Sequence, residues 1–234
     1  MKSYCYLASR TIARTFLCPF VRLQVWRTHG AVEPAGAAVL VANHISHFDP
    51  VFLSIAFDRM IDWMTSAEFY DNRLTAAWLR AVNTFPVDRS RPDRRALRLG
   101  VERLRAGRMV GVFPEGGIRA GVTSILEGAA PKSGATALAR LTGARIIPCV
   151  ILGTDRLYAT RSWRPGPPRI QVWVTIGPPF SVAGTNSAQA NAHLAGALRE
   201  LCAAAIAHFN LGPQDLPATP QRRKGRDAQA MPNE

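Results

Sequence analysis

Residues 37–50 read AAVLVANHISHFDP, an apolar run that passes directly into a polar cluster. A short continuous apolar run is typical of a strand buried on both faces of a parallel sheet, so residues 37–42 are predicted to form one. The polar side chains among residues 43–50 then predict a loop, and residues 51–57 are predicted to form a helix. We therefore expect the polar side chains to lie where a buried strand ends.

The same alternation of strand and helix patterns continues along the chain. A length of 234 residues fits one large domain, and strands that alternate with helices predict an α/β architecture. We expect a single domain over residues 29–211, with a central, mostly parallel sheet flanked by helices. Pro148 predicts an edge or a bulge in its strand, because proline cannot donate to a ladder. Further strands are expected at residues 61–65, 84–87, 109–113, 145–152 and 170–176, and further helices at 67–82, 94–106, 133–141 and 188–209.

The two ends of the chain differ from this pattern. Residues 1–28 read as an amphipathic helical segment, which Pro19 should break or kink. Such a segment can lie in the headgroup layer of a membrane or pack on the domain's own core, and the sequence leaves both open. Residues 212–234 are proline-rich, polar and charged, which predicts a disordered basic tail. The apolar face of the first segment consists of Ile12, Phe16, Phe20 and Leu23.

The net charge of +13 comes almost entirely from arginine. Such a balance suits nucleic acid, an anionic membrane surface or an acidic substrate. The chain lacks zinc-finger spacing and RNA-binding motifs, so we expect no nucleic-acid partner. Its four scattered cysteines favour free thiols in a reducing compartment. No apolar run reaches the roughly 18 residues of a membrane span, and no signal peptide is recognised. Peripheral or monotopic attachment at the cytoplasmic face of a membrane is therefore expected.

The polar cluster contains a candidate for general-base chemistry. Ligands of open α/β sheets bind beyond the carboxyl ends of strands, which places His44 at the working edge of the sheet. A histidine can take a hydroxyl proton near neutral pH, and it does so best when a carboxylate holds its other ring nitrogen. Asp49 can reach back to His44 if the chain turns into a helix there. The residues thus predict a His–Asp pair that activates an external hydroxyl.

His47 leaves a second interpretation open. Together with His44 and Asp49 it could form a two-histidine, one-carboxylate metal site, if both imidazoles lie on one side of the loop. Such a site would serve a metal-dependent hydrolase. No second cluster of histidine and acidic residues supports a metal, so we expect none.

Two further segments suit the binding of a polyol or a phosphate. Residues 113–119, FPEGGIR, place Glu115 and Arg119 in a glycine-rich turn after a buried strand, where the backbone can approach a ligand closely. Residues 85–89, FPVDR, end an extended piece on Arg89, whose guanidinium suits a phosphate.

Together and in this order, these segments resemble the motifs of the glycerolipid acyltransferase family, of the lysophosphatidic acid acyltransferase type. The first family motif is Asn-His-x-Ser-x-x-Asp, and Asn43, His44, Ser46 and Asp49 match it. The resemblance covers roughly residues 26–180.

The later family motifs are also present in order. The second motif ends in an arginine, and Phe85 and Arg89 match it. The third motif begins Phe-Pro-Glu-Gly, which residues 113–116 match. The fourth centres on a Val-Pro pair, to which Ile147 and Pro148 correspond.

The resemblance implies a role for each of these residues. His44 would deprotonate the acceptor hydroxyl and Asp49 would orient His44. The hydroxyl would attack an acyl thioester of coenzyme A or of acyl carrier protein, with no cofactor and no metal. The acceptor would be a lysophospholipid, by default 1-acylglycerol-3-phosphate, which would give phosphatidic acid. Its glycerol phosphate would be bound at Arg89, Glu115, Gly116, Gly117, Arg119 and Ser46.

The chain departs from the family pattern within the acceptor motifs. Asn83 stands near the place where the second motif opens with glycine. The third motif continues with Thr-Arg in the family, whereas Gly117 and Ile118 follow here and Arg119 comes one residue late. Another lysolipid or an amphiphilic alcohol is therefore an alternative acceptor. A membrane-surface binding protein without catalysis is a further alternative, since it would use the same N-terminal segment and net charge.

Overall fold

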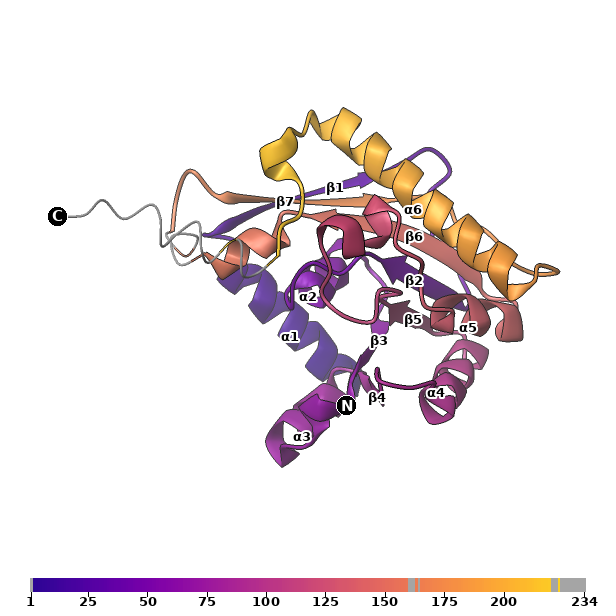
Figure 1. The fold of residues 1–234 in the computed structure, drawn as a ribbon. Coiled ribbons are helices and arrows are strands. Elements are labelled where there is room, and N and C mark those ends of the chain that lie inside the picture. Colours follow the sequence, from indigo (N-terminus) through magenta and orange to yellow (C-terminus); the bar gives the residue numbers. More distant parts are fainter. Residues whose placement is uncertain (1, 160–162, 164, 220–222, 224–234) are drawn as a thin grey trace.

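Seven strands form one sheet at the centre of the computed structural model, which describes residues 2–159, 163, 165–219 and 223 (Figure 1). Their order is β1-β7-β6-β2-β5-β3-β4. Neighbouring strands are parallel except β6 and β7, so β1 and β7 run against the other five. The strands are β1 (Val21–Arg27), β2 (Ala38–Ala42), β3 (Ile61–Ser66), β4 (Phe85–Val87), β5 (Met109–Val112), β6 (Arg145–Leu152) and β7 (Ile170–Ile176).

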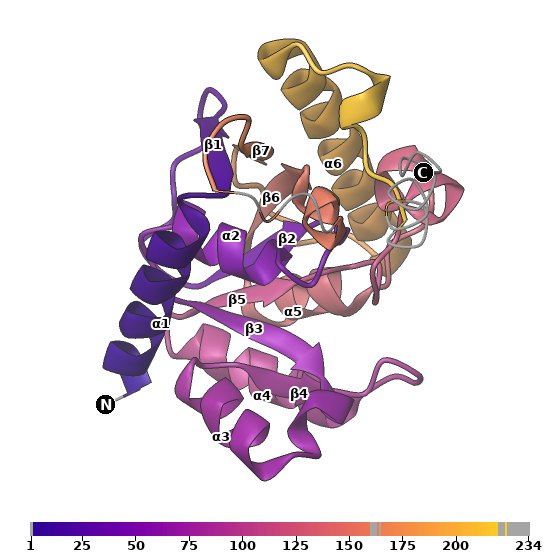
Figure 2. The same cartoon turned by 90° about the vertical axis from the view of Figure 1, so that its left-hand side faces the viewer.

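Helices cover both faces of this sheet (Figures 1 and 2). One face packs against α1 and α2, and the other against α4, α5 and α6. The expected α/β domain with a central, mostly parallel sheet flanked by helices is confirmed. The helices are α1 (Lys2–Leu17), α2 (Asp49–Ala56), α3 (Arg73–Ala81), α4 (Arg94–Arg105), α5 (Gly134–Thr142) and α6 (Ser187–Phe209), with short 3₁₀ turns η1 (Ala67–Tyr70), η2 (Gly121–Thr123), η3 (Ile125–Glu127), η4 (Thr154–Tyr158) and η6 (Pro213–Asp215).

Strand β2 lies in the middle of the sheet and is fully buried. Val39 and Val41 point into the apolar cluster with α4, α5 and α6, whereas Ala38, Leu40 and Ala42 point into the cluster with α1 and α2. Both faces of the strand are therefore apolar, which explains why its sequence is a continuous apolar run.

Side-chain caps determine where several helices begin. The Asn72 side chain accepts from the backbone N–H groups of Leu74 and Thr75, so the helix expected at 67–82 is divided into η1 and α3. Asp93 caps α4 in the same way, and Asn186 opens α6 with a capping box.

The N-terminal segment is helical only as far as Leu17. The expectation of a helical segment over residues 1–28 is wrong from Val21 onward, because Val21–Arg27 form the edge strand β1, paired with β7. Val21, Leu23 and Val25 alternate with more polar residues, and this period of two suits a strand. Pro19 lies in the turn between the two elements, as predicted.

Helix α1 packs on the domain and also exposes apolar side chains. The Tyr6 hydroxyl accepts from the Ile61 N–H, and the Arg10 guanidinium donates to the Phe57 and Asp58 carbonyls. On its outer side Ile12 is 68% exposed, and Tyr4, Leu7 and Phe16 are also exposed. No described helix is both long and apolar enough to span a membrane.

The C-terminal segment is ordered where the structure describes it. Disorder from residue 212 onward is wrong for residues 212–219 and 223, and residues 220–222 and 224–234 lie outside the described residues. Asp215 pairs with Arg156, and Arg223 pairs with Asp155, a buried residue of η4. These ion pairs attach the segment to the domain.

Pro148 lies at an irregularity of the pairing, as expected for a proline in a strand. The β6–β7 ladder ends at Cys149 and Ile176, and the next bridge joins Ile146 to Phe180, so two residues of β6 lie opposite three residues of the other chain segment, as in a bulge. Strand β6 has β2 on one side and β7 on the other. The Pro148 carbonyl accepts from the N–H of Gly177, one residue beyond the end of β7. The N–H that proline lacks would face the same side, beyond the last pair of the β6–β7 ladder, Cys149 and Ile176.

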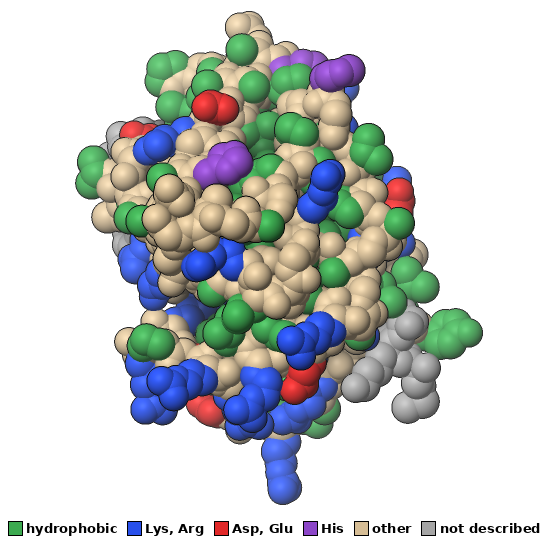
Figure 3. All heavy atoms as spheres, turned by 90° about the vertical axis from the view of Figure 1, so that its right-hand side faces the viewer, with side chains coloured by type: hydrophobic (Ala, Val, Ile, Leu, Met, Phe, Trp, Pro, Cys, Tyr) green, Lys and Arg blue, Asp and Glu red, His purple; other side chains and the backbone are tan. Residues whose placement is uncertain are grey.

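Arginines are frequent on the surface around α4. Figure 3 shows Lys and Arg side chains crowded over the lower part of the face that includes α4. The exposed arginines of α4 are Arg94, Arg95, Arg98 and Arg105.

Candidate active site

The carboxyl ends of five parallel strands meet at one edge of the sheet, in the order β6-β2-β5-β3-β4. Thr154 follows β6, His44 follows β2 and Glu115 follows β5, while Arg89 follows β4. Topology alone thus brings together residues that lie far apart in the sequence, where ligands of open α/β sheets bind.

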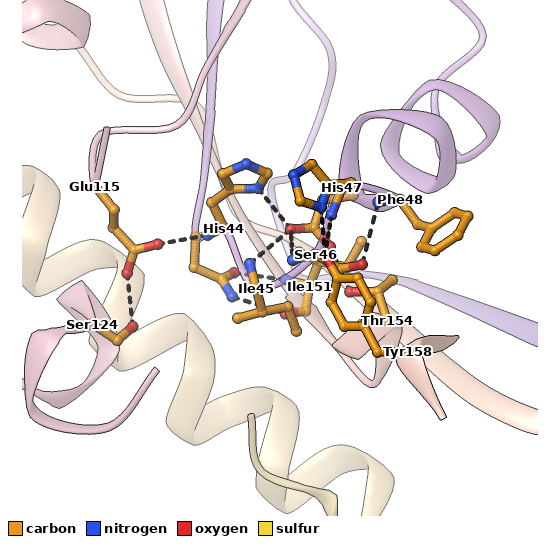
Figure 4. A network of polar contacts seen from close by, with 12 residues as sticks. His44, Ile45, Ser46, His47, Phe48, Glu115, Ser124, Ile151, Thr154 and Tyr158 are labelled. Atoms are coloured by element: carbon orange, nitrogen blue, oxygen red, sulfur yellow. Dashed lines mark hydrogen bonds and ion pairs between the residues drawn. The ribbon is translucent and has the colours of Figure 1, made fainter. Parts of the chain in front are cut away.

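The Asp49 carboxylate organises the loop that follows β2 (Figure 4). Asp49 is fully buried in the first turn of α2. Its Oδ2 accepts from the backbone N–H groups of Ile45 (2.7 Å) and Ser46 (2.8 Å) and lies 2.9 Å from His44 Nδ1. Its Oδ1 accepts from the Thr154 hydroxyl at 2.5 Å. Several donors and the helix N-terminus compensate the buried negative charge.

His44 is oriented as a base would need to be. An ionised carboxylate can only accept, so the His44 Nδ1 carries the proton that faces Asp49. Nε2 then has a free lone pair and makes no hydrogen bond to the described residues. His44 is 5% exposed and lines the adjacent cavity. The structure therefore brings the predicted pair His44 and Asp49 together.

The His44 ring is also held by stacking. It lies parallel to the Phe113 ring, with centroids 4.1 Å apart, and Phe113 stacks in turn on Trp63 at 5.0 Å. Trp63 donates from its indole N–H to the Ser54 hydroxyl. Sequence reasoning missed Trp63, because nothing in its local sequence shows that β3 lies beside the end of β5.

Asn43 fixes the point at which the loop leaves β2. Its amide donates to the Ile151 carbonyl at 2.9 Å and accepts from the Ile151 N–H at 2.8 Å. The fully buried side chain thus continues the β2–β6 pairing by one residue.

Glu115 faces the protein backbone and not the cavity. Its Oε2 accepts from the His44 N–H at 2.6 Å, and its Oε1 accepts from the Ser124 hydroxyl and the Ile125 N–H (Figure 4). Burial raises the pKa of Glu115, while these hydrogen bonds oppose the rise. Three protein donors occupy the carboxylate that the sequence suggested for substrate binding, so its visible role is to hold the His44 backbone.

Three other predicted binding residues also lie outside the cavity lining. The buried Ser46 accepts from the Phe48 N–H. Arg119 donates its backbone N–H to the His44 carbonyl, and its side chain is exposed. Gly117 is half-buried next to the Arg119 guanidinium. It is Ile118 that lines the cavity, where the family motif has arginine.

Gly116, the remaining glycine of the predicted site, leaves room for Lys132. It has a φ of +69°, and a Cβ at this position would lie 2.6 Å from Lys132 Nζ. Lys132 Nζ donates to the Arg89 carbonyl at 3.1 Å. A second cation is therefore held beside Arg89.

Arg89 does line the cavity, together with His44. Its side chain is half-buried, and the guanidinium makes no hydrogen bond to the described residues. Burial lowers the pKa of Arg89, and the nearby Glu68 opposes this effect. An arginine remains charged at neutral pH, so Arg89 offers an anion site beside His44.

His47 also lines the cavity, but among the described residues its ring hydrogen-bonds to Tyr158 and not to Asp49. Its Nδ1 lies 2.6 Å from the Tyr158 hydroxyl of η4. Burial, followed by the proximity of His44, lowers the pKa of His47. Among the described residues, no three His, Cys, Asp or Glu side chains are arranged to hold a metal ion.

The cavity beside His44 has a volume of about 440 Å³, within the range of small-molecule sites. It lies between α1, α2, α3 and the ends of β3 and β5. Its lining is mostly apolar, with Arg10 and Arg89 as its cations; the apolar side chains include Val51, Trp63, Met64, Phe69, Trp78, Leu79, Val82, Phe113 and Ile118.

Known proteins resemble this chain in sequence and in fold. A sequence model of the family described as Acyltransferase matches residues 26–152. The chain is 27% identical over 122 residues to a 1-acyl-sn-glycerol-3-phosphate acyltransferase of Bacillus subtilis (strain 168), covering 51% of this chain and 58% of the relative. It is 28% identical over 147 residues to a protein of the same name from Streptococcus pneumoniae (strain ATCC BAA-255 / R6), covering 62% of this chain and 50% of the relative.

A solved structure shares the fold. The crystal structure of the 1-acyl-sn-glycerophosphate (LPA) acyltransferase PlsC from Thermotoga maritima matches with a TM-score of 0.64 and 21% identity, over 88% of this chain and 81% of that one. The matched parts of the two curated relatives amount to 58% and 50% of their lengths. The family match includes His44, Asp49, Arg89 and Glu115 and covers more than half of the chain. The chain therefore belongs to the acyltransferase family.

Proposed function

We propose that the protein transfers a fatty acyl group from a thioester to the hydroxyl of a lysophospholipid, by default 1-acylglycerol-3-phosphate. The observation that carries this proposal is the His44–Asp49 pair at the end of an apolar cavity, which is also lined by Arg89, a cation without a hydrogen bond from its guanidinium to the described residues. Two curated relatives named 1-acyl-sn-glycerol-3-phosphate acyltransferase support it.

In the proposed reaction, His44 Nε2 takes the proton of the acceptor hydroxyl as its oxygen attacks the thioester carbonyl. Asp49 stabilises the imidazolium that forms, through the hydrogen bond at Nδ1. Collapse of the tetrahedral intermediate breaks the carbon–sulfur bond, and His44 returns the proton to the departing thiolate. The products are an ester and a free thiol.

Arg89 is the proposed phosphate site for the acceptor. It lines the same cavity as His44, and Lys132 beside it strengthens the positive potential. Ile118 replaces a cation of the family motif at the cavity wall, so another lysolipid or an amphiphilic alcohol is the alternative acceptor. The other predicted binding residues would then support this site without contacting the acceptor; they are Ser46, Glu115, Gly116, Gly117 and Arg119.

The donor in this proposal is acyl-CoA or acyl carrier protein, with its acyl chain in the apolar cavity. The exposed arginines of α4 would attract the phosphates of coenzyme A or an acidic carrier protein. The reaction as proposed needs no cofactor.

Attachment to the cytoplasmic face of an anionic membrane is proposed through α1 and α3. Both helices line the cavity and expose large apolar side chains outside it. On α3, Leu74 is 82% exposed, and Trp78 lines the cavity with one part of its side chain and is exposed with the other. Apolar side chains next to arginines suit the headgroup layer, and a lipid substrate would enter from there.

Replacing His44→Ala should lower kcat by about 10²- to 10⁴-fold, the usual contribution of a general base. The measurement is thiol release from acyl-CoA with lysophosphatidic acid as acceptor, with circular dichroism to verify the fold. His47→Ala, whose ring pairs with Tyr158, should cost less than about tenfold.

Two other outcomes would favour the alternatives. Equal losses for His44→Ala and His47→Ala, together with loss of activity in a strong chelator, would favour the metal site. Vesicle binding with no transfer from any thioester donor to any lysolipid would favour a binding protein without catalysis.

Replacing Arg89→Ala should raise the KM for lysophosphatidic acid by about 10- to 100-fold, the value of a hydrogen bond to a charged group. The KM for a monoacylglycerol, which has no phosphate, should change little. Arg91→Ala is the matched control, because Arg91 lies on the same loop and is exposed. Equal effects on both acceptors would contradict a phosphate site at Arg89.

Replacing both Ile12→Glu and Leu74→Glu should weaken vesicle binding by about tenfold or more, since each buried apolar side chain contributes about 1.5–3 kcal/mol. Co-sedimentation with vesicles of phosphatidylcholine and phosphatidylglycerol in equal parts measures this. Val122→Glu is the control, because Val122 is 87% exposed on η2, beside η3 on the α6 side of the domain. Equal loss with the control would refute the proposed membrane face.

A further inference from the structure

Among the described residues, Asp49 has one hydrogen-bond partner outside its own loop. Its Oδ2 is shared by donors from residues 44–46, whereas Oδ1 accepts from the Thr154 hydroxyl, 105 residues away in the sequence. Thr154 is fully buried and does not line the cavity. The orientation of the carboxylate about its last side-chain torsion thus depends on η4.

Gly153 brings Thr154 into reach of Asp49. It has a φ of +89°, and a Cβ at this position would lie 2.2 Å from the Gln171 carbonyl oxygen, so only glycine fits. The chain therefore turns out of β6 directly into η4, and Thr154 points back to the loop that follows β2. At the other end of η4, the Tyr158 hydroxyl contacts both Nδ1 and the backbone N–H of His47. Both ends of η4 hold the same loop (Figure 4).

The C-terminal segment, residues 212–219 and 223, forms hydrogen bonds and ion pairs with η4. Asp155 Oδ2 accepts from the Arg223 Nε at 2.6 Å and from the Ala218 N–H at 3.0 Å. Arg223 also donates to the Leu216 carbonyl, and Asp215 pairs with Arg156. The residue next to Thr154 is thus tied to a segment that lies beyond the family match, which ends at residue 152.

The ion pair between Asp155 and Arg223 is an unfavourable way to attach residues 212–219 and 223 to the domain. Asp155 is fully buried, its Oδ1 has no hydrogen-bond partner among the described residues, and burial raises its pKa. A buried carboxylate with an unsatisfied oxygen stabilises a fold poorly compared with apolar packing. The directional hydrogen bonds of such a pair do, however, fix the orientation of the element that carries it, which here is η4.

We infer that Thr154, and the Asp155–Arg223 pair behind it, are positioning residues for the His44–Asp49 pair. The inference rests on the proposed function, in which Asp49 must hold the His44 Nδ1–H in line. Without these contacts the Asp49 carboxylate can rotate, and His44 Nε2 spends less time aimed into the cavity. Because none of the three residues lines the cavity, the loss falls on kcat and not on KM.

Thr154→Val removes the hydroxyl and keeps the shape of the side chain. We expect kcat to fall by about tenfold or more, as for loss of one hydrogen bond to a charged group, with KM within about twofold of wild type. Thr154→Ser restores the hydroxyl and should recover most of kcat. A kcat for Thr154→Val equal to that of wild type, or no recovery with serine, would overturn the role of Thr154.

The second measurement does not depend on turnover. Hydrogen exchange followed by mass spectrometry reports on residues 43–50, whose Ile45 and Ser46 amides donate to Asp49. Arg223→Ala should increase the exchange rate of this segment by about threefold or more. Partial loss of the amide hydrogen bonds to the charged Asp49 carboxylate lowers the free energy of local opening by an amount that corresponds to such a factor. Arg199→Ala, exposed on α6, should leave it unchanged.

The two measurements separate the inference from the proposed function. Unchanged exchange at residues 43–50 in Arg223→Ala would overturn the inference, even with an active enzyme. Faster exchange in a protein that transfers no acyl group would uphold the positioning and refute the proposed reaction.

Discussion

The geometry of the site depends on the hydrogen bonds that the buried Asp49 carboxylate accepts. A charge with no exposure is tolerated only when donors surround it, and here they come from the His44 ring, two backbone N–H groups of its own loop and the Thr154 hydroxyl. Meeting that requirement closes the loop after β2 and fixes the tautomer of His44. It also joins that loop to the end of β6.

A second carboxylate acts on the same histidine from the other side. Glu115 binds the His44 N–H, so His44 is held at its ring by Asp49 and at its backbone by Glu115. Phe113, two residues before Glu115, stacks on the ring. The turn at residues 113–117 thus holds His44 through Phe113 and Glu115, and Phe113 lines the cavity together with Arg89 and Ile118.

The sequence predicted the parts of this arrangement that depend on local pattern. The run at residues 37–42 is apolar because both faces of β2 are covered, and the spacing of His44 and Asp49 suits a loop that closes on a carboxylate. The secondary structure of residues 21–27 is harder to predict, because their apolar side chains fit a helix nearly as well as an edge strand. The sequence suggests Glu115 as a ligand for substrate, because no local pattern shows that the chain turns back and brings Ser124 and Ile125 to its carboxylate. Thr154 gave one usable signal, a polar residue directly after a strand, but its link to Asp49 depends on β6 lying beside β2.

We propose that the negative charge of Asp49, and not merely its shape, makes His44 a base. The direct measurement is kcat for acyl transfer by Asp49→Asn, an isosteric change, with its fold verified by circular dichroism. Loss of the charge should lower kcat by about 10³- to 10⁴-fold, as in other His–Asp pairs, with the fold retained. A folded Asp49→Asn protein with kcat within about tenfold of wild type would contradict this role of the Asp49 charge.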